Sequence, residues 1–366
     1  KNPDTHSNRS RTLRALGRLS ESEYAARAAL ALLPNHVEAL VNLGVTQVAM
    51  GQREAAEATY RDALKANPQA AVVHHNLAQI LLQTARFIDG WEAFEWRWNT
   101  PDFRSVDEFL TLPNWRGETL EGGTLLVWPE QGVGDQILYS GMIADLKKRT
   151  SNILIACTER LVPLLTRSFP FATVMSLSDL KADNYLLGSI TAQVPAGSLG
   201  RFLRPTLNSF LPHDGYLIAD SSRAESKKEY YNGQFGDVVK IGLSWRSSNP
   251  RFGAVKSIAL KELIPLFGMP DTVFIDLQYG DTAAEREAFA GATDNILFHD
   301  RKVDSLKSLE DFVAQVAALD LVITASNTAA HVAGALGIPC WVLLPSGPGL
   351  FWYWFLDRSD SPWYPT

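Results

Sequence analysis

Three short segments of the chain combine small, hydroxyl or charged residues with the end of an apolar run. The first is Glu130-Gln131-Gly132-Val133-Gly134-Asp135, the second runs from residue 246 to 256, and the third from 325 to 331. Glycines let a backbone approach a ligand closely, and the start of a helix offers unpaired N–H groups to an anion. The three segments together predict a site for a phosphate-bearing ligand.

The first segment follows the apolar run 124–128 and leads into a predicted helix, and it allows more than one interpretation. Gly132 and Gly134 suggest a dinucleotide-binding turn. However, Ile137 occupies the third glycine position, and no acidic residue ends a second strand about 20 residues further on. Asp135 falls at the expected helix N-cap, where aspartate is common for structural reasons alone. Asp135 is therefore either a capping residue or a chemically active carboxylate.

The second segment is basic. Arg246, Arg251 and Lys256 follow the apolar run 239–245, in a chain whose formal net charge is -6. Arginine and lysine form charge-assisted hydrogen bonds with phosphates, so this local charge indicates phosphate binding. An exposed loop with ordinary basic residues is the alternative.

The third segment, 325–329, supplies small and hydroxyl residues before a helix expected at 329–336. Free N–H groups and the helix dipole at such a start favour an anion. The helix is expected to stop at Gly337, which Pro339 follows. His331 is either a ligand contact or a packing histidine.

The pattern after residue 121 predicts the elements that position these segments. Short apolar runs alternate with amphipathic stretches, which is typical of parallel sheets covered by helices on both faces. A polar stretch at 220–237 divides the region into two lobes, whose ligands would bind at the carboxyl ends of the strands. Strands are expected at 124–128, 152–157, 173–175, 239–245, 272–277, 295–298, 319–324 and 340–344, and helices at 136–149, 161–168, 260–267, 282–290, 309–318 and 329–336.

The first hundred residues instead show an internal repeat. Gly17 and Gly51 are 34 positions apart (51 − 17), and the same spacing separates Pro34 from Pro68. Small and large residues such as Gly44, Ala56 and Tyr60 fall where two antiparallel helices must interlock. The period and residue types over about 5–100 resemble the tetratricopeptide repeat family, whose units stack into a solenoid with a concave groove. A generic bundle of helical hairpins is the alternative.

An aromatic stripe ends the repeat region. Trp91, Phe94 and Trp98 follow i, i+3, i+7 spacing, which predicts one packed helix face, interpreted as the seam between the repeats and the later region. The expected organisation is a repeat domain at 1–100, a linker at 101–120, and Rossmann-like lobes at 121–222 and 238–366.

Composition excludes several classes of protein. The chain has 366 residues, 46% hydrophobic and 20% charged, and no basic cluster that a nucleic-acid partner would require. Cys157 and Cys340 lie far apart, which indicates a reducing compartment. No apolar run reaches the roughly 18 residues of a membrane span, and no signal peptide is evident, so a cytoplasmic location is expected. The histidines are scattered without zinc-site spacing, so no metal site is expected. The chain begins with Lys1 rather than Met, which suggests trimming at that end.

These segments together resemble sugar transferases with two Rossmann-like lobes (GT-B type), in particular the heptosyltransferase-like family and its tetratricopeptide-fused relatives. The fused group includes bacterial flagellin glycosyltransferases and is more distantly related to protein O-linked N-acetylglucosamine transferases. The matching motifs are Trp115-Arg116-Gly117, Glu130-Gln131-Gly132-Val133-Gly134-Asp135, Ile241-Gly242-Leu243-Ser244-Trp245, Asp276-Leu277-Gln278-Tyr279-Gly280, Ala330-His331-Val332-Ala333-Gly334-Ala335-Leu336-Gly337 and Ser361-Pro362-Trp363-Tyr364-Pro365.

The resemblance implies roles for individual residues. Asp135 occupies the position of the family's proposed base, which would accept a proton from the acceptor hydroxyl. The helix start at 327–329 would hold the leaving phosphate, and Lys256 and Arg246 would neutralise its charge without a metal. The expected catalytic set is Asp135, His331 and Lys256. The expected donor contacts are Gly132, Gly134, Trp245, Arg246, Lys256, Gln278, Tyr279, Ser326, Asn327, Thr328, Ala329 and His331.

The function implied by this resemblance is transfer of a sugar, with inversion, from a nucleotide-sugar cosubstrate to a Ser or Thr hydroxyl. The acceptor would be a protein captured by the repeat groove, with flagellin as one candidate. The alternatives are a saccharide or lipid-glycan transferase whose repeats serve oligomerisation, and a non-catalytic scaffold that binds a sugar nucleotide.

Two departures from the family pattern are present. Ser326-Asn327 stands where many relatives carry Asp followed by Thr or Ser, which leaves the donor sugar open. The chain also stops just after the motif at 361–365, where relatives usually continue through a closing helix, which suggests truncation or disorder at that end.

Overall fold

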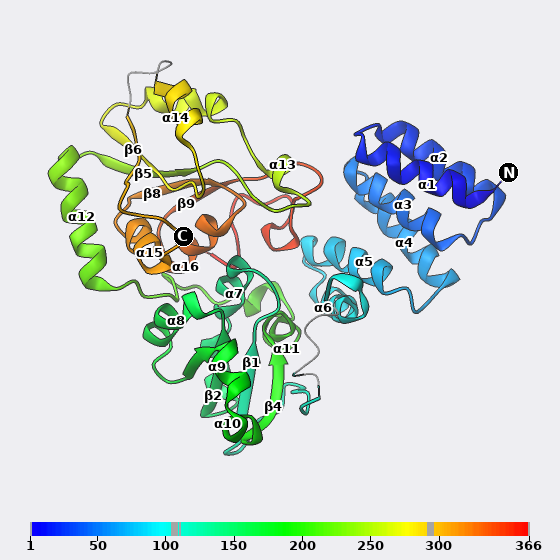
Figure 1. Cartoon of the computed structure of the whole chain (residues 1–366). Helices are drawn as coiled ribbons and strands as arrows, with labels where there is room; N and C mark the ends of the chain where they lie inside the picture. Colours follow the sequence, from blue (N-terminus) through cyan, green and yellow to red (C-terminus); the bar gives the residue numbers. More distant parts are fainter. Residues whose placement is uncertain (1, 104–108, 110, 291–295, 365–366) are drawn as a thin grey trace. The chain divides into compact units, whose positions relative to one another are not determined.

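The structure is a computed structural model that describes residues 2–103, 109, 111–290 and 296–364 (Figure 1). It divides into two compact units. Unit 1 comprises Lys1–Asp107, Arg204–Leu207 and Pro345–Ser359, and unit 2 comprises Glu108–Leu203, Asn208–Leu344 and Asp360–Thr366.

Unit 1 is built from the helical hairpins α1–α2, α3–α4 and α5–α6, so the predicted solenoid of repeats is confirmed (blue to cyan in Figure 1). The second hairpin shows why small residues recur at the crossing of its helices. A Cβ added to Gly44 would lie 2.3 Å from Cε1 of the buried Tyr60, so the two helices approach closely through glycine. The helices are α1 (Pro3–Ala15), α2 (Leu19–Leu32), α3 (Val37–Ala49), α4 (Arg53–Ala66), α5 (Ala71–Gln83) and α6 (Phe87–Phe94).

The aromatic stripe packs against a later part of the chain, but not as one helix face. Trp91 and Phe94 of α6 form edge contacts with Trp352, at ring-centroid distances of 5.1 and 5.9 Å. Helix α6 ends at Phe94, and the chain continues as a 3₁₀-helix, η1 (Glu95–Asn99), whose tighter turn changes the direction of the following side chains. Trp98 therefore packs against Phe103 instead.

The segment 345–359, which the sequence assigns to the second lobe, packs within unit 1. It contains a short 3₁₀-helix, η9 (Trp352–Trp354). The side-chain amide of Gln83 donates to the carbonyl of Leu350 at 2.7 Å, and the N–H of Leu356 donates to the carbonyl of Gln83 at 3.2 Å. Because Gln83, the last residue of α5, makes both hydrogen bonds, this segment is attached to the last helical hairpin.

Unit 2 contains two parallel sheets, as the alternating pattern predicts. The first lobe has the strand order β3-β2-β1-β4 and the second lobe the order β7-β6-β5-β8-β9. The strands are β1 (Thr124–Trp128), β2 (Asn152–Cys157), β3 (Thr173–Ser176), β4 (Ile190–Pro195), β5 (Val239–Ser244), β6 (Thr272–Asp276), β7 (Leu297–Phe298), β8 (Leu321–Ala325) and β9 (Cys340–Leu343).

Strand β4 is absent from the predicted set, although it pairs with β1 along most of its length. Its sequence interrupts an apolar run with Thr191 and Gln193. Gln193 is fully buried, where it accepts a hydrogen bond from the indole of Trp128 at 2.5 Å. A hydrophobicity pattern therefore misses this strand, because one of its buried side chains is polar and has a specific hydrogen-bond partner. For the strand predicted at 295–298, residue 295 lies outside the described residues, as does Pro365 of the last motif.

Three stretches of unit 2 have a different helical structure from the one predicted. The helix expected at 136–149 is α7 (Val133–Ser140) followed by a 3₁₀-helix, η4 (Ile143–Lys148). The expected helix at 260–267 is the 3₁₀-helix η8 (Leu260–Gly268), and Pro265 within it removes a helical donor. The polar stretch at 220–237 contains the helix α12 (Ser221–Phe235). Its sequence is mostly polar because Tyr231 is its one buried residue.

The other predicted helices are present as α8 (Val162–Ser168), α14 (Ala283–Ala290), α15 (Leu309–Ala317) and α16 (Thr328–Leu336). The short helices α9 (Leu177–Ala182), α10 (Asn184–Gly188), α11 (Leu199–Leu203) and α13 (Gly253–Lys256) were not predicted. Helices α7 and α16 come from different lobes and pack against each other. Among the described residues, no helix has both the length and the apolar character that crossing a bilayer would require.

Candidate active site

Asp135 lies in the first turn of α7, directly beyond the buried strand β1. The N-cap of this helix is Gly132, with extended backbone at φ -65° and ψ 173°, so the prediction that Asp135 is the N-cap residue is wrong. The backbone N–H of Gly132 instead lowers the pKa of the Asp135 carboxylate, which lies on the side of the helix start. A carboxylate at this position satisfies a free donor of the first turn, as the acidic residue of a capping box does.

Burial, together with the negative charge of Glu130, raises the pKa of Asp135 to about 6, although the ammonium of Lys256 acts in the opposite direction. Glu130 is held in place because its Oε1 accepts the N–H of Gly197 at 2.6 Å. A carboxylate with this pKa is ionised at neutral pH and still more basic than an ordinary aspartate. Both properties suit a general base.

Lys256 comes from the other lobe, at the end of α13, and its side chain is buried. Burial lowers the pKa of Lys256 to about 8, and the charge of Asp135 opposes this decrease. Lys256 and Asp135 affect each other's pKa through their charges, so the basic segment and the first glycine segment lie within electrostatic range of each other. Arg251, from the same segment, lies over the ring of Phe252 at 5.1 Å.

His331, on α16, is the third side chain of the candidate site, after Asp135 and Lys256. A Cβ added to Gly134 would lie 3.0 Å from Cδ2 and 3.5 Å from Nε2 of His331, so the imidazole packs directly against the backbone of the first glycine segment. Burial, together with the positive charge of Lys256, lowers the pKa of His331 to about 3. The imidazole is therefore neutral at physiological pH and acts through hydrogen bonds rather than as a cation.

Asn327 is the N-cap of α16 and is engaged within the second lobe. Its Oδ1 accepts the N–H of Ala329 at 2.9 Å. Its Nδ2 donates to Ser244 Oγ at 2.8 Å and to the carbonyl of Arg246 at 3.0 Å, which joins the ends of β5 and β8. The neighbouring Ser326 is fully buried, whereas Thr328 is half-buried at the start of the helix.

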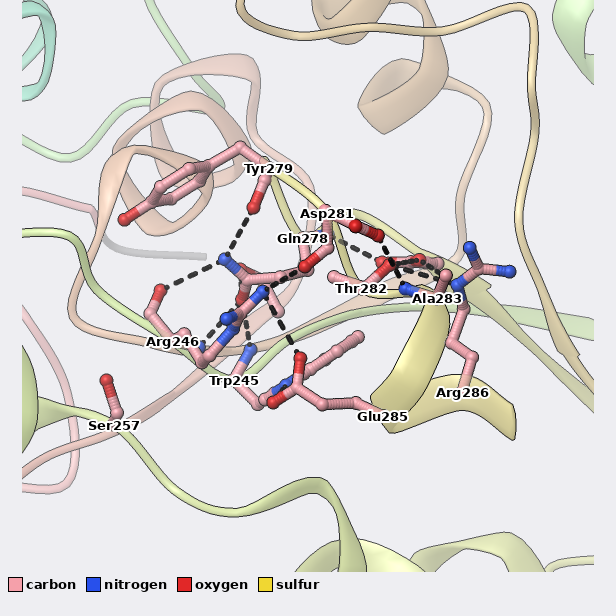
Figure 2. A network of polar contacts seen from close by, with 12 residues as sticks. Trp245, Arg246, Ser257, Gln278, Tyr279, Asp281, Thr282, Ala283, Glu285 and Arg286 are labelled. Atoms are coloured by element: carbon pink, nitrogen blue, oxygen red, sulfur yellow. Dashed lines mark hydrogen bonds and ion pairs between the residues drawn. The ribbon is translucent and has the colours of Figure 1, made fainter. Parts of the chain in front are cut away.

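Four of the predicted donor contacts form a polar network that closes the end of β5 (Figure 2). Gln278 Oε1 accepts the N–H groups of Trp245 and Arg246 at 2.9 and 2.7 Å. The Arg246 guanidinium pairs with Glu285 at 3.2 Å, and the hydroxyl of Tyr279 accepts a hydrogen bond from the N–H of Ser248. These side chains shape the loop around Lys256, a structural role that the sequence did not indicate.

A cavity of about 260 Å³ opens at the carboxyl end of β6, in the second lobe. Gln278, Tyr279 and Gly280 line one part of it. Other lining residues, which include His299, Arg301, Val303, Asp304, Ser305, Leu306, Phe312 and Gln315, were not predicted from the sequence. The signal that could have found them is His299-Asp300-Arg301, a run of charged or titratable residues directly after the apolar pair of β7.

His299 is held at this cavity by a buried carboxylate. Its Nδ1 lies 3.0 Å from Asp276 Oδ2, and the same carboxylate accepts hydrogen bonds from the N–H of Gln278 at 2.8 Å and the hydroxyl of Thr282 at 3.0 Å. Burial raises the pKa of Asp276, against the effect of these donors. The last residue of β6 therefore organises the cavity wall.

The fold and the site together define a class of protein: helical repeats joined to two Rossmann-like α/β lobes, with a carboxylate from one lobe beside a lysine and a histidine from the other. The family described as tetratricopeptide repeat matches residues 13–80, so the N-terminal region carries these repeats.

The chain is also similar to Protein FlbA of Caulobacter vibrioides, with 29% identity over 359 residues, covering 92% of this chain and 58% of that protein. The chain thus spans less than two thirds of the length of this curated relative.

Solved structures that resemble the chain include a glycosyl transferase family 9 protein from Veillonella parvula, at 13% identity and a TM-score of 0.48, covering 64% of this chain and 86% of the other. The E. coli ADP-heptose lps heptosyltransferase II has 16% identity and a TM-score of 0.43, covering 60% and 84%. The Thermobaculum terrenum O-GlcNAc transferase has 12% identity and a TM-score of 0.26, covering 92% and 81%.

Proposed function

We propose that the chain is a glycosyltransferase that moves a sugar from a nucleotide-activated donor to a hydroxyl acceptor. The observation that carries this proposal is the group formed by Asp135, Lys256 and His331. A carboxylate of raised pKa, a buried ammonium and a neutral imidazole meet from two lobes. This combination can remove a proton from one substrate and receive negative charge from another.

In the proposed reaction, Asp135 accepts the proton of the acceptor hydroxyl. At the same time, the oxygen of that hydroxyl forms a bond to the anomeric carbon of the donor sugar. The bond between that carbon and the phosphate oxygen breaks, and its electron pair leaves with the nucleotide. Lys256 and the N-terminus of α16 receive the negative charge that develops on the phosphate. Attack on the face opposite the leaving group inverts the anomeric centre.

The nucleoside of the donor is proposed to occupy the cavity beside Gln278 and Tyr279. This cavity lies at the carboxyl end of β6, which pairs with β5, and β5 pairs in turn with β8. Ligands of open parallel sheets bind at this edge. A nucleotide there could direct its phosphates toward Lys256 after β5 and toward α16 after β8.

The acceptor is proposed to be a protein segment bound in the groove of the repeats, with flagellin as a candidate, and the reaction is proposed to occur in the cytoplasm. The support is the repeat architecture, because solenoid grooves suit extended polypeptides better than small molecules. A mechanism without a metal is proposed because Lys256 and the helix N-terminus together supply positive charge.

The test is a matched pair of variants in a transfer assay. The wild-type protein is first screened by thermal shift against UDP-, GDP-, ADP-, dTDP- and CMP-sugars, and the stabilising donor is then used to follow nucleotide release with an acceptor protein. Asp135→Asn should lower kcat by about 100-fold or more, because a general base contributes on the order of 10²–10⁴ to the rate. Asp145→Asn serves as the control, since this residue lies in η4 and its charge faces Lys148 at 3.8 Å.

Equal turnover by Asp135→Asn and wild type would refute the assignment of the base. A donor that binds without transfer to any acceptor would favour a sugar-nucleotide-binding scaffold. Transfer to a saccharide or lipid but to no protein would favour the glycan-transferase alternative.

A further inference from the structure

Tyr364 makes a contact that the proposed reaction does not explain. Its hydroxyl lies 2.8 Å from Nδ1 of His331, and both side chains are buried. The phenol ring occupies the space above Gly334, where an added Cβ would lie 2.4 Å from Cγ of Tyr364. Gly334 and His331 are on the same helix, so the helix surface accommodates the ring and places the hydroxyl against the imidazole.

The chemistry of the two groups indicates the direction of this hydrogen bond. A phenol is a better donor than acceptor, because its oxygen lone pair is partly delocalised into the ring, and a neutral imidazole nitrogen without a proton is a strong acceptor. If the Tyr364 hydroxyl donates to Nδ1, the single imidazole proton must be on Nε2, since a neutral histidine carries one N–H.

We propose that Tyr364 is a positioning residue that fixes His331 in the tautomer with the proton on Nε2, so that His331 presents an N–H, and not a lone pair, to the leaving phosphate. The proposal rests on the proposed glycosyl transfer. Nε2 is on the imidazole edge that faces Gly134, since an added Cβ there would lie 3.5 Å from it, and Asp135 is the next residue. An N–H on Nε2 therefore lies at the backbone that leads into the proposed base, in a position to donate to an anionic oxygen bound between the lobes.

The opposite tautomer would place a lone pair toward the same phosphate. An unprotonated nitrogen repels an anionic oxygen, and a buried phosphate oxygen without its donor loses a charge-assisted hydrogen bond. Tyr364 acts through His331 in this scheme and does not touch the reacting atoms. Its effect is thus expected on turnover more than on acceptor binding.

The tautomer can be measured in the full chain by long-range ¹H–¹⁵N correlation spectroscopy with ¹⁵N-histidine labelling at pH 7. The signals of His331 are assigned by their loss in His331→Gln. Wild type should show the Nε2–H pattern, and Tyr364→Phe, which keeps the ring above Gly334, should show a mixture of tautomers. Tyr216→Phe is the matched control, because its hydroxyl donates to the carbonyl of Ile137 at 2.9 Å and its ring lies 6.3 Å from that of Tyr364.

Kinetics give the second readout. Tyr364→Phe should lower kcat about 3- to 10-fold with an unchanged KM for the acceptor, the size expected from one hydrogen bond. An Nδ1–H pattern in wild type, or an unchanged tautomer in Tyr364→Phe, would overturn the proposal. A wild-type protein that transfers no sugar from any donor would refute the proposed function, while the tautomer measurement would still decide what Tyr364 does to His331.

Discussion

Replacing Asp135 with asparagine should stabilise the folded protein at pH 8, although it removes the proposed base. The pKa of Asp135 is about 6 in the folded chain against 3.8 for an ordinary aspartate, mainly because of burial. This difference of about 2 pKa units corresponds to about 3 kcal/mol of unfolding free energy that the ionised carboxylate costs the native state. Asparagine removes that cost. The net gain is smaller, because Lys256 loses the partner that opposes its own desolvation.

The effect has a defined dependence on pH. A carboxyl whose folded pKa is raised destabilises the native state fully above the folded pKa, here about 6. The penalty decreases as the pH falls from about 6 toward 3.8, where the unfolded carboxyl also becomes protonated. Asp135→Asn should therefore have a higher Tm than wild type at pH 8, by roughly 2–4 °C for each kcal/mol gained, and nearly the same Tm at pH 4.

Asp300 provides a control of opposite sign. Burial raises the pKa of Asp300, but hydrogen bonds from Lys227, Lys302 and Tyr231 outweigh it and hold the pKa below its ordinary value. The Lys227 ammonium lies 2.7 Å from its carboxylate. Asp300→Asn should therefore lower the Tm at pH 8. If thermal scans showed Asp135→Asn to be less stable than wild type at pH 8, the argument from desolvation would be refuted.

Three further predictions concern the site and the repeats. Lys256→Met should move the acidic limb of the pH profile of kcat/KM upward from about 6, because the ammonium lowers the pKa of Asp135; an unmoved limb would show that the two groups are not coupled. Gly44→Ala should destabilise unit 1 by about 1–3 kcal/mol in urea denaturation, because its Cβ would lie 2.3 Å from the Tyr60 ring, and an unchanged midpoint would show that the helices can separate at no cost. Transfer activity should survive dialysis against EDTA, and loss of activity restored by a divalent cation would contradict the metal-free mechanism.

The sequence predicts the parts of this fold that depend on periodicity. The 34-residue spacing identifies the repeats, and alternating apolar runs identify both sheets and most of their strands. Its failures have a common cause, which is tertiary context. β4 is hidden because Gln193 is buried with a specific partner, and the stretch at 260–268 is a 3₁₀-helix because Pro265 removes a helical donor. The local hydrophobic pattern alone reveals neither the buried Gln193 nor the 3₁₀ geometry around Pro265.

The sequence likewise predicts some features of the candidate site and misses others. Motif spacing anticipates the segments that carry Asp135, Lys256 and His331, because the carboxyl ends of parallel strands present their loops at one edge. The sequence could not reveal that Gln278 turns inward to bind the backbone at Trp245, or that Arg246 is paired with Glu285. These partners come from loops that are adjacent in space and distant along the chain.

Asn327 illustrates what this means for the donor sugar. The resemblance places Ser326 where many relatives carry an aspartate, and Asn327→Asp would introduce a carboxylate at the adjacent position as a contact for the sugar. The structure argues otherwise, because both amide hydrogens donate within the protein, at 2.8 Å to Ser244 and 3.0 Å to the Arg246 carbonyl. A carboxylate there would lose both donors and face a carbonyl oxygen.

Asn327→Asp should therefore destabilise unit 2 by about 1–3 kcal/mol, the cost of leaving buried polar groups without partners, and should leave the order of donor preference unchanged. Thr328→Ala, at the half-buried next position, is the matched control and should change stability by less than about 0.5 kcal/mol. Chemical denaturation and the donor thermal-shift screen measure both effects. If Asn327→Asp were as stable as wild type and gained a new preferred donor, Asn327 would be a sugar contact rather than the bond that joins the ends of β5 and β8. Donor selection would then have to be sought at Asn327 rather than around the cavity at β6.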